Sequence, residues 1–520
     1  MPHGRHGDAA ATPSSDKVRQ DAVNSFRLTA ALLFGACLSG CMTAGPDFRQ
    51  PAAPAASRYT ETPMPDETAA APGIGGGASQ HLVSGGDLPA QWWSLFRSEA
   101  LDRVVRQAID ENPTLAAAQA TLRQARENLA AQSGALLSPA VDLNAGAARE
   151  RVSGAAFGRP DAGASIFSLY NASVNVSYQL DAFGGNRREL EALQAAVDYQ
   201  RYQFQAAHLA LTSNVVTGAI REASLRAQIG ATQEIIAAER QQLELVQRQY
   251  ELGAAARLAV LTLKSQLDQT RSTLPPLERN LAQARHQLAV LSGRLPGEAA
   301  LPEFDLDQLE LPPELPLSLP SQLARQRPDI RAAEALLHQA SAQIGVATAD
   351  LYPKINLSAS LGLEATQLHE LFGGPALWSL AAALAQPLFH GGALDAKRRA
   401  AVAAYDQAQA QYRQTVLVAF QNVADALRAL EADARALSAQ ADAEASARET
   451  LSLTQRQYRL GGASALALLV AQQQYQQVRL ALAAAQAARY ADTAALFQSL
   501  GGGWWQQEGA DAAASLTQKN

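Results

Sequence analysis

The chain has 520 residues, of which 48% are hydrophobic, so it is long enough to bury a large core. Its 43 Lys and Arg residues stand against 49 Asp and Glu residues, and neither this net charge of −6 nor any basic patch indicates a nucleic-acid partner. Both cysteines lie near the N-terminus, which excludes a disulfide framework for the rest of the chain. Because no nucleophile, phosphate-binding or metal-binding motif occurs, we expect neither an enzyme nor a cofactor.

The N-terminal segment is typical of a secretory signal. Residues 28–40 read LTAALLFGACLSG after Arg27, which is too short for a stable membrane span, so residues 1–40 are predicted to be a signal peptide. Its end resembles a bacterial lipobox, in which Cys41 carries the lipid and becomes the mature N-terminus, anchored by its acyl chains. The alternative is a signal peptide with an incidental cysteine. Met42 follows in place of an aspartate, which favours delivery to the outer membrane.

The rest of the chain contains an internal duplication. Residues 184–221 align without a gap with residues 391–428, at an offset of 391 − 184 = 207. Further on, RQYELGAAARLAVL at 248–261 matches RQYRLGGASALALL at 456–469, at an offset of 456 − 248 = 208. A repeat of this kind predicts a tandem architecture. In chain order we expect a lipidated N-terminal linker at 41–90, a first repeat at 91–296, a proline- and leucine-rich linker at 297–320, a second repeat at 321–503 and a tail at 504–520.

Each repeat is predicted to contain a helix, two strands and a long helical hairpin. The first helices begin with a proline, which suits the first helical position, and cover about 113–136 and 328–350. Alternation with a period of two predicts strands at about 139–148, 168–181, 353–363 and 376–389. Apolar residues recurring every three to four positions, many of them alanine, predict hairpins at about 187–292 and 394–500. Four strands cannot close a barrel and lipid does not tolerate open sheet edges, so we expect other copies of the chain to complete the barrel.

Several long motifs follow one another along the chain. They are Cys41 with GPDF (45–48), QLDAFGGNRR (179–188), TLPPLERNLAQARHQLAVLSG (273–293), QRPDIRAAEALLHQASAQIGVATADLYPKINL (326–357) and QPLFHGG (386–392). In these motifs the chain resembles the outer-membrane efflux proteins of the TolC/OprM type, in their NodT-like lipoprotein branch. The resemblance implies a mainly α fold with a membrane β-barrel. Three copies would each contribute four strands to a 12-stranded barrel, and their hairpins would form a periplasmic α-barrel.

The resemblance also implies a function. We expect the exit duct of a tripartite efflux pump in the outer membrane of a Gram-negative cell, acting as a passive conduit for drugs or small molecules. The implied partners are the other copies in a homotrimer, a periplasmic adaptor (membrane fusion) protein, an inner-membrane RND transporter that supplies the energy, and outer-membrane lipid. The alternatives are a channel for type I protein secretion and a periplasm-spanning structural lipoprotein without a pore.

Two groups of residues are candidate sites under this resemblance. The hairpin tips resemble the family's adaptor-contact motif, although glycine there can also serve only as a helix C-cap: Leu252, Gly253, Ala254, Leu460, Gly461 and Gly462. Many family members place aspartates six and nine residues after the second tip glycine, where this chain has Ala467 and Val470. We therefore predict a gate closed by apolar packing and dewetting, formed by Leu466, Leu469 and Val470. Tyr458, Arg257 and Arg459 are predicted to hold the tips shut, unless the tyrosine is only a core residue.

Three further features are predicted to be structural. The motif Arg327-Pro328-Asp329-Ile330 would start a helix beside the barrel junction. The pair Pro275-Pro276 would bend or break a helix. The tryptophan pairs Trp92-Trp93 and Trp504-Trp505 would pack around an equatorial region, or else anchor at a membrane interface.

Overall fold

The computed structural model describes residues 43–158, 161 and 163–506, and the chain divides into two compact units. In its described part, unit 1 contains residues 43–48, Ala131–Ala192 and Ala340–Ala403, and unit 2 contains Arg49–Ala130, Leu193–Gln339 and residues 404–506. The proposed signal peptide, its lipidation site Cys41 and most of the tail lie outside the described residues. Within the described residues, no helix combines the length and the apolar character needed to cross a membrane.

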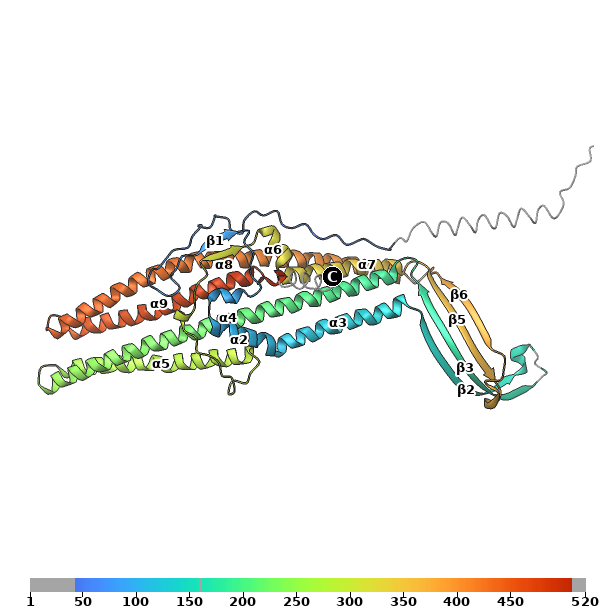
Figure 1. Cartoon of the computed structure of the whole chain (residues 1–520), viewed down its shortest axis with the longest axis horizontal. Helices are drawn as coiled ribbons and strands as arrows, with labels where there is room; N and C mark the ends of the chain where they lie inside the picture. The colour runs from blue at the N-terminus through green and yellow to red at the C-terminus, as the bar shows by residue number, and fades with distance from the viewer. Residues whose placement is uncertain (1–42, 159–160, 162, 507–520) are drawn as a thin grey trace, which may run out of the picture. The chain divides into compact units, whose positions relative to one another are not determined.

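Unit 1 contains a four-stranded antiparallel sheet to which both repeats contribute (Figure 1). Its strands lie in the order β2 (Ala140–Ser153), β3 (Ala164–Leu180), β5 (Lys354–Ala365) and β6 (Leu377–Ala385). The central pair, β3 and β5, joins the two repeats and places Val176 opposite Ala359. β2 passes its predicted end at residue 148, because its backbone pairs with β3 as far as Ser153 although its apolar alternation stops after Leu143. The two hairpin loops contain short 3-10 helices, η2 (Gly154–Phe157) and η5 (Leu368–Glu370).

The helices follow the same duplication. The first repeat contains α3 (Pro113–Leu137), α4 (Gly185–Glu251) and α5 (Arg257–Leu291), and the second contains α7 (Pro328–Ala349), α8 (Ala393–Arg459) and α9 (Ala465–Ser499). The equivalent helices α4 and α8 are each 67 residues long. Pro275 and Pro276 lie inside α5 and do not break it, which corrects one of the two outcomes expected for this pair. Each proline removes a single backbone donor, and buried residues on both sides, such as Leu267 and Leu288, keep the helix continuous.

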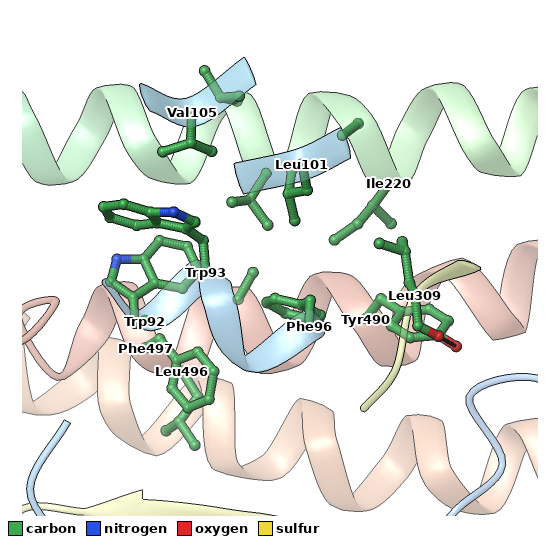
Figure 2. Packing of buried hydrophobic residues seen from close by; sticks show 14 of the residues in the cluster. Trp92, Trp93, Phe96, Leu101, Val105, Ile220, Leu309, Tyr490, Leu496 and Phe497 are labelled. Carbon is green, nitrogen blue, oxygen red and sulfur yellow. Dashed lines mark hydrogen bonds between the residues drawn. The ribbon is translucent and has the colours of Figure 1, made fainter. Parts of the chain in front are cut away.

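The largest hydrophobic core belongs to unit 2 and surrounds the first tryptophan pair (Figure 2). These tryptophans begin η1 (Trp92–Phe96), which precedes α2 (Glu99–Glu111). The rings of Trp92 and Phe96 meet the ring of Phe497 edge-on, with centroid distances of 5.8 Å and 6.4 Å. Burial in this aromatic cluster favours packing over membrane anchoring as the role of Trp92 and Trp93.

From Arg49 onward, the two segments predicted to be linkers belong to unit 2 and contain short strands. β1 (His81–Ser84) from the first segment pairs in parallel with β4 (Glu314–Leu317) from the second. The second segment also contains η4 (Leu306–Gln308) and leads into α6 (Pro320–Gln326). Leu88 and Leu315 are buried in the main core. Leucines within these proline-rich segments therefore bury apolar surface, so the segments pack on the core as well as connecting the parts of the chain.

Candidate functional site

Both hairpins of unit 2 end in the same glycine turn. At the first tip, Gly253 has φ 75° and its N–H donates to the carbonyl of Tyr250 at 2.9 Å. At the second tip, Gly461 has φ 77° and its N–H donates to the carbonyl of Tyr458 at 3.0 Å. A Cβ added at either glycine would meet no atom within 4 Å. Glycine is therefore favoured at both tips by the positive φ of a helix C-cap and not by lack of space.

Each glycine turn carries an exposed leucine. Leu252 is 84% exposed and Leu460 is 86% exposed. Both tips lie at the same end of unit 2, where α4 turns into α5 and α8 turns into α9 (Figure 1). The remaining tip residues, including Ala254 and Gly462, are also exposed, so all six residues predicted as tip contacts are accessible. The turns thus present matched apolar side chains, which is compatible with contact to a partner.

The predicted gate residues lie in the first turns of α9. Leu466 is 66% exposed and Val470 is 57% exposed, and their spacing of four residues places them on one helix face. Leu469 is half-buried, whereas its neighbour Leu468 is fully buried. The structure therefore brings Leu466 and Val470 together on an exposed apolar stripe, with Leu469 at its margin.

A second stripe was not predicted. Leu258 and Leu261 of α5, which correspond to Leu466 and Leu469 at the offset of 208, are 74% and 51% exposed. The repeat alignment carried the signal that could have identified them. The chain therefore has an exposed apolar stripe next to each tip, and the two stripes share the equivalent residues Leu258 and Leu466.

The polar residues predicted to hold the tips together do not bond to one another within the described chain. Arg257 and Arg459 are exposed, and neither forms a hydrogen bond with Tyr458 among the described residues. Tyr458 is half-buried, and this burial raises its pKa. A tie through these three residues thus stays a prediction about contacts between copies of the chain.

A polar seam connects the two hairpins further from the tips. Gln472 of α9 donates from Nε2 to Oε1 of Gln242 on α4 at 2.7 Å, and Gln473 donates to Oε1 of Gln266 on α5 at 2.9 Å. Gln266 in turn donates to the buried carboxylate of Glu239 at 3.2 Å. Burial raises the pKa of Glu239, because the charged form loses hydration. Sequence analysis missed this seam because its members come from three helices and form no motif.

The motif Arg327-Pro328-Asp329-Ile330 joins the start of α7 to the end of α9. Arg327 is buried and donates to the carbonyl of Ser499 at 2.7 Å, while two of its nitrogens donate to Asp329 at 3.0 Å and 2.7 Å. Asp329 also accepts from the N–H of Ile330 at 2.9 Å, which satisfies a free donor in the first turn. The motif is therefore structural. Its expected place beside the strands is wrong, because α7 continues for 22 residues from this point.

In unit 1, Arg188 holds the first described residues of the chain. Its side chain is buried and donates to Oδ1 of Asp47 at 2.6 Å and to the carbonyl of Ala44 at 3.0 Å. Gly45, with φ 81°, packs so closely that an added Cβ would lie 2.5 Å from the Cα of Gly345. Three of the motifs that carried the resemblance thus contact one another around Arg188. No feature of the sequence predicted this contact.

Comparison with known proteins places these features in a family. The family model for outer membrane efflux proteins matches residues 104–294 and 319–502, one match in each repeat. A probable efflux pump outer membrane protein of Pseudomonas putida, TtgC, is 30% identical over 480 residues, covering 91% of this chain and 94% of TtgC. Nodulation protein T of Rhizobium leguminosarum is 30% identical over 472 residues, covering 89% of this chain and 90% of the relative. The solved outer-membrane channel OprN superposes with a TM-score of 0.80 at 27% identity, over 89% of this chain and 99% of OprN. The chain belongs to the outer membrane efflux protein family.

Proposed function

We propose that the chain is the outer-membrane exit duct of a tripartite efflux pump, a passive conduit for drugs or small molecules and not an enzyme. The observation that carries this proposal is the family match across both repeats, combined with a sheet and two long hairpins in one chain. Relatives named for efflux, such as TtgC, favour small-molecule export over type I protein secretion.

The sheet of unit 1 supports assembly into a homotrimer. Strands β2 and β6 each have one edge that no described strand pairs. Apolar side chains also stand exposed on these strands, including Leu143, Trp378 and Leu380. Open edges cannot remain in lipid, because unpaired backbone groups find no water there. Three copies with four strands each would give the 12-stranded barrel that closes these edges.

The barrel and the hairpin tips would then have separate partners. The lipid on Cys41 and the barrel would hold the trimer in the outer membrane. The tips around Gly253 and Gly461 would contact a periplasmic adaptor protein. An RND transporter in the inner membrane would supply the energy, as the resemblance to this family implies.

Deletion of the gene in its native host tests this function. We expect the deletion strain to accumulate fluorescent dyes and to become sensitive to several small toxic compounds, and a plasmid copy to reverse both effects. Unchanged accumulation together with the loss of a secreted protein from the medium would instead identify a type I secretion channel. Mass spectrometry of the mature protein should in addition show acyl chains on Cys41, and an unmodified N-terminus elsewhere would refute the lipid anchor.

A further inference from the structure

The sheet of unit 1 has one apolar face and one polar face. Successive residues of a strand point to opposite faces, and residues paired across strands share a face. One row of paired residues across the four strands is Val141, Val176, Ala359 and Leu380. The next row, on the opposite face, is Asp142, Asn175, Ser360 and Ser379. In an outer-membrane barrel the apolar face contacts lipid and the polar face lines the lumen.

Two arginines lie on the apolar face of this sheet. Arg149 and Arg151 are an even number of positions from Val141 on β2, and they are the only charged residues on that face of the four described strands. The other charged residues of these strands lie on the polar face: Asp142, Glu150, Lys354 and Glu364. Both arginines are exposed, and neither forms a hydrogen bond or an ion pair with a described residue. Their positive charges are therefore available to a partner on the lipid side.

The arginines lie just beyond the apolar band, the stretch of the apolar face from Leu180 to Tyr170 of β3 and the residues paired with it. At a rise of about 3.4 Å per residue and a strand tilt of about 40°, this band spans about 25 Å across the bilayer, which is the usual height of the lipid-facing band of a barrel. Ser168 follows Tyr170 on the same face and pairs with Arg149. Arg151 lies two residues further out. Both guanidinium groups therefore reach the level of the lipid headgroups.

This end of the sheet faces the cell exterior. At the other end the strands continue into the helices, since β3 ends at Leu180 and α4 begins at Gly185. Channels of this family extend from the outer membrane into the periplasm on their helical side. The loop between β2 and β3 therefore lies on the outer side, where the outer leaflet of a Gram-negative outer membrane carries a phosphorylated glycolipid.

We propose that Arg149 and Arg151 bind the phosphate groups of lipid A in the outer leaflet, an inference that rests on the proposed barrel. A guanidinium group donates two parallel N–H bonds to a phosphate, which suits arginine to this ligand. The hydroxyl of Ser168, opposite Arg149 on the same face, adds a further donor. The acyl chains of the glycolipid contact the apolar band, and no carboxylate on this face of the described strands repels the phosphates.

Native mass spectrometry of the purified full-length protein, titrated with lipid A in detergent, tests the site because one spectrum shows both the assembly and the bound lipid. We expect Arg149→Gln combined with Arg151→Gln to weaken the binding of lipid A about tenfold or more, because charge-assisted hydrogen bonds are lost. Glu150→Gln, between the two arginines but on the polar face, is the matched control and should leave the affinity unchanged. Lipid A from which the phosphates have been removed should bind the unsubstituted protein no better than lipid A binds the double variant.

A second double variant separates the charge from any folding defect. Arg149→Lys combined with Arg151→Lys keeps both charges and should retain most of the affinity for lipid A. Equal affinity in the glutamine variant and the unsubstituted protein would overturn the proposal, as would equal binding of lipid A without phosphates. Loss of the trimer in the glutamine variant with unchanged binding of lipid A would also overturn it, because the arginines would then contact another copy of the chain. The titration needs no pump partner, so its failure would leave the proposed function standing.

Discussion

Buried charges in unit 2 find their partners on a second segment of the chain. Glu222 of α4 is fully buried and accepts from Nη1 of Arg285 on α5 at 2.5 Å. Arg489 of α9 is also fully buried and donates to the carbonyls of Leu430 at 3.2 Å and Ala78 at 3.3 Å. Burial raises the pKa of Glu222 and lowers that of Arg489, because both charged forms lose hydration. Glu222 therefore connects α4 to α5, and Arg489 connects α9 to the N-terminal segment of unit 2. Their hydrogen-bond partners offset the free energy that burial of the two charges costs.

Replacing Arg285 with alanine tests the first of these contacts. The variant leaves the carboxylate of Glu222 buried without its ion-pair partner, so we expect the free energy of unfolding to fall by about 3–5 kcal/mol. Arg279→Ala, an exposed position on the same helix, should change it by no more than about 0.5 kcal/mol. Chemical unfolding in detergent measures both values, and equal effects of the two substitutions would contradict the assigned role.

Asp492 predicts a dependence of stability on pH. Burial raises the pKa of Asp492 from 3.8 to about 7, and the neighbouring carboxyl of Asp433 adds to the rise. The charge of Arg489 opposes it. The pKa of Asp492 is therefore higher in the folded state than in the unfolded state. Its favourable contribution to the free energy of unfolding is complete below pH 3.8 and is lost as the pH rises through about 7.

We therefore expect Asp492→Asn to unfold at a higher temperature than the unsubstituted protein at pH 8. The gain should be about 1–2 kcal/mol after allowance for solvent screening, and it should vanish in acid. Asp406→Asn on the exposed face of α8 serves as the control and should show no such trend. A difference that stays constant between pH 4 and pH 8 would refute this account of Asp492.

Among the structural elements, the two glycine turns are the ones most closely tied to the proposed function, because they form the proposed adaptor contact. Replacing Gly253 and Gly461 with valine places β-branched residues at φ 75° and 77°, which costs about 1–3 kcal/mol at each turn. We expect drug resistance to be lost while the trimer still assembles, because the strain is confined to the tips. Gly230→Ala, inside α4 with no atom within 4 Å of the added Cβ, should be neutral or slightly stabilising. Full resistance in the double variant at normal expression would count against the tips as the adaptor contact.

The gate makes a separate prediction about ions. Leu466→Ser combined with Leu469→Ser should raise single-channel conductance, because a polar constriction stays wet. Since no carboxylate follows Gly461 in the sequence before Asp492, we also expect weak ion selectivity in a salt gradient. Leu295→Ser, in the loop after α5, is the control for an exposed leucine outside the stripes. Strong cation selectivity with tight block by divalent ions from the periplasmic side would exclude an apolar gate.

For the molecule as a whole, the duplication could be predicted because equivalent residues recur at a nearly constant offset. The equal lengths of α4 and α8 and the four strands follow from that repeat and from its local periodicity. The parallel pairing of β1 with β4 could not be predicted, since it joins segments whose proline-rich composition resembles a linker and conceals buried leucines such as Leu315. The polar seam was equally hidden, because Gln242 and Gln472 become hydrogen-bond partners only when the two hairpins pack together.

If copies of this chain enclose a continuous pore, the purified protein should conduct ions across a planar bilayer, which single-channel recording measures. We expect discrete conductance steps that become larger when Leu466 and Leu469 are replaced by serine. Trimers that insert into the bilayer but show no conductance above the bare membrane, with or without these substitutions, would contradict it.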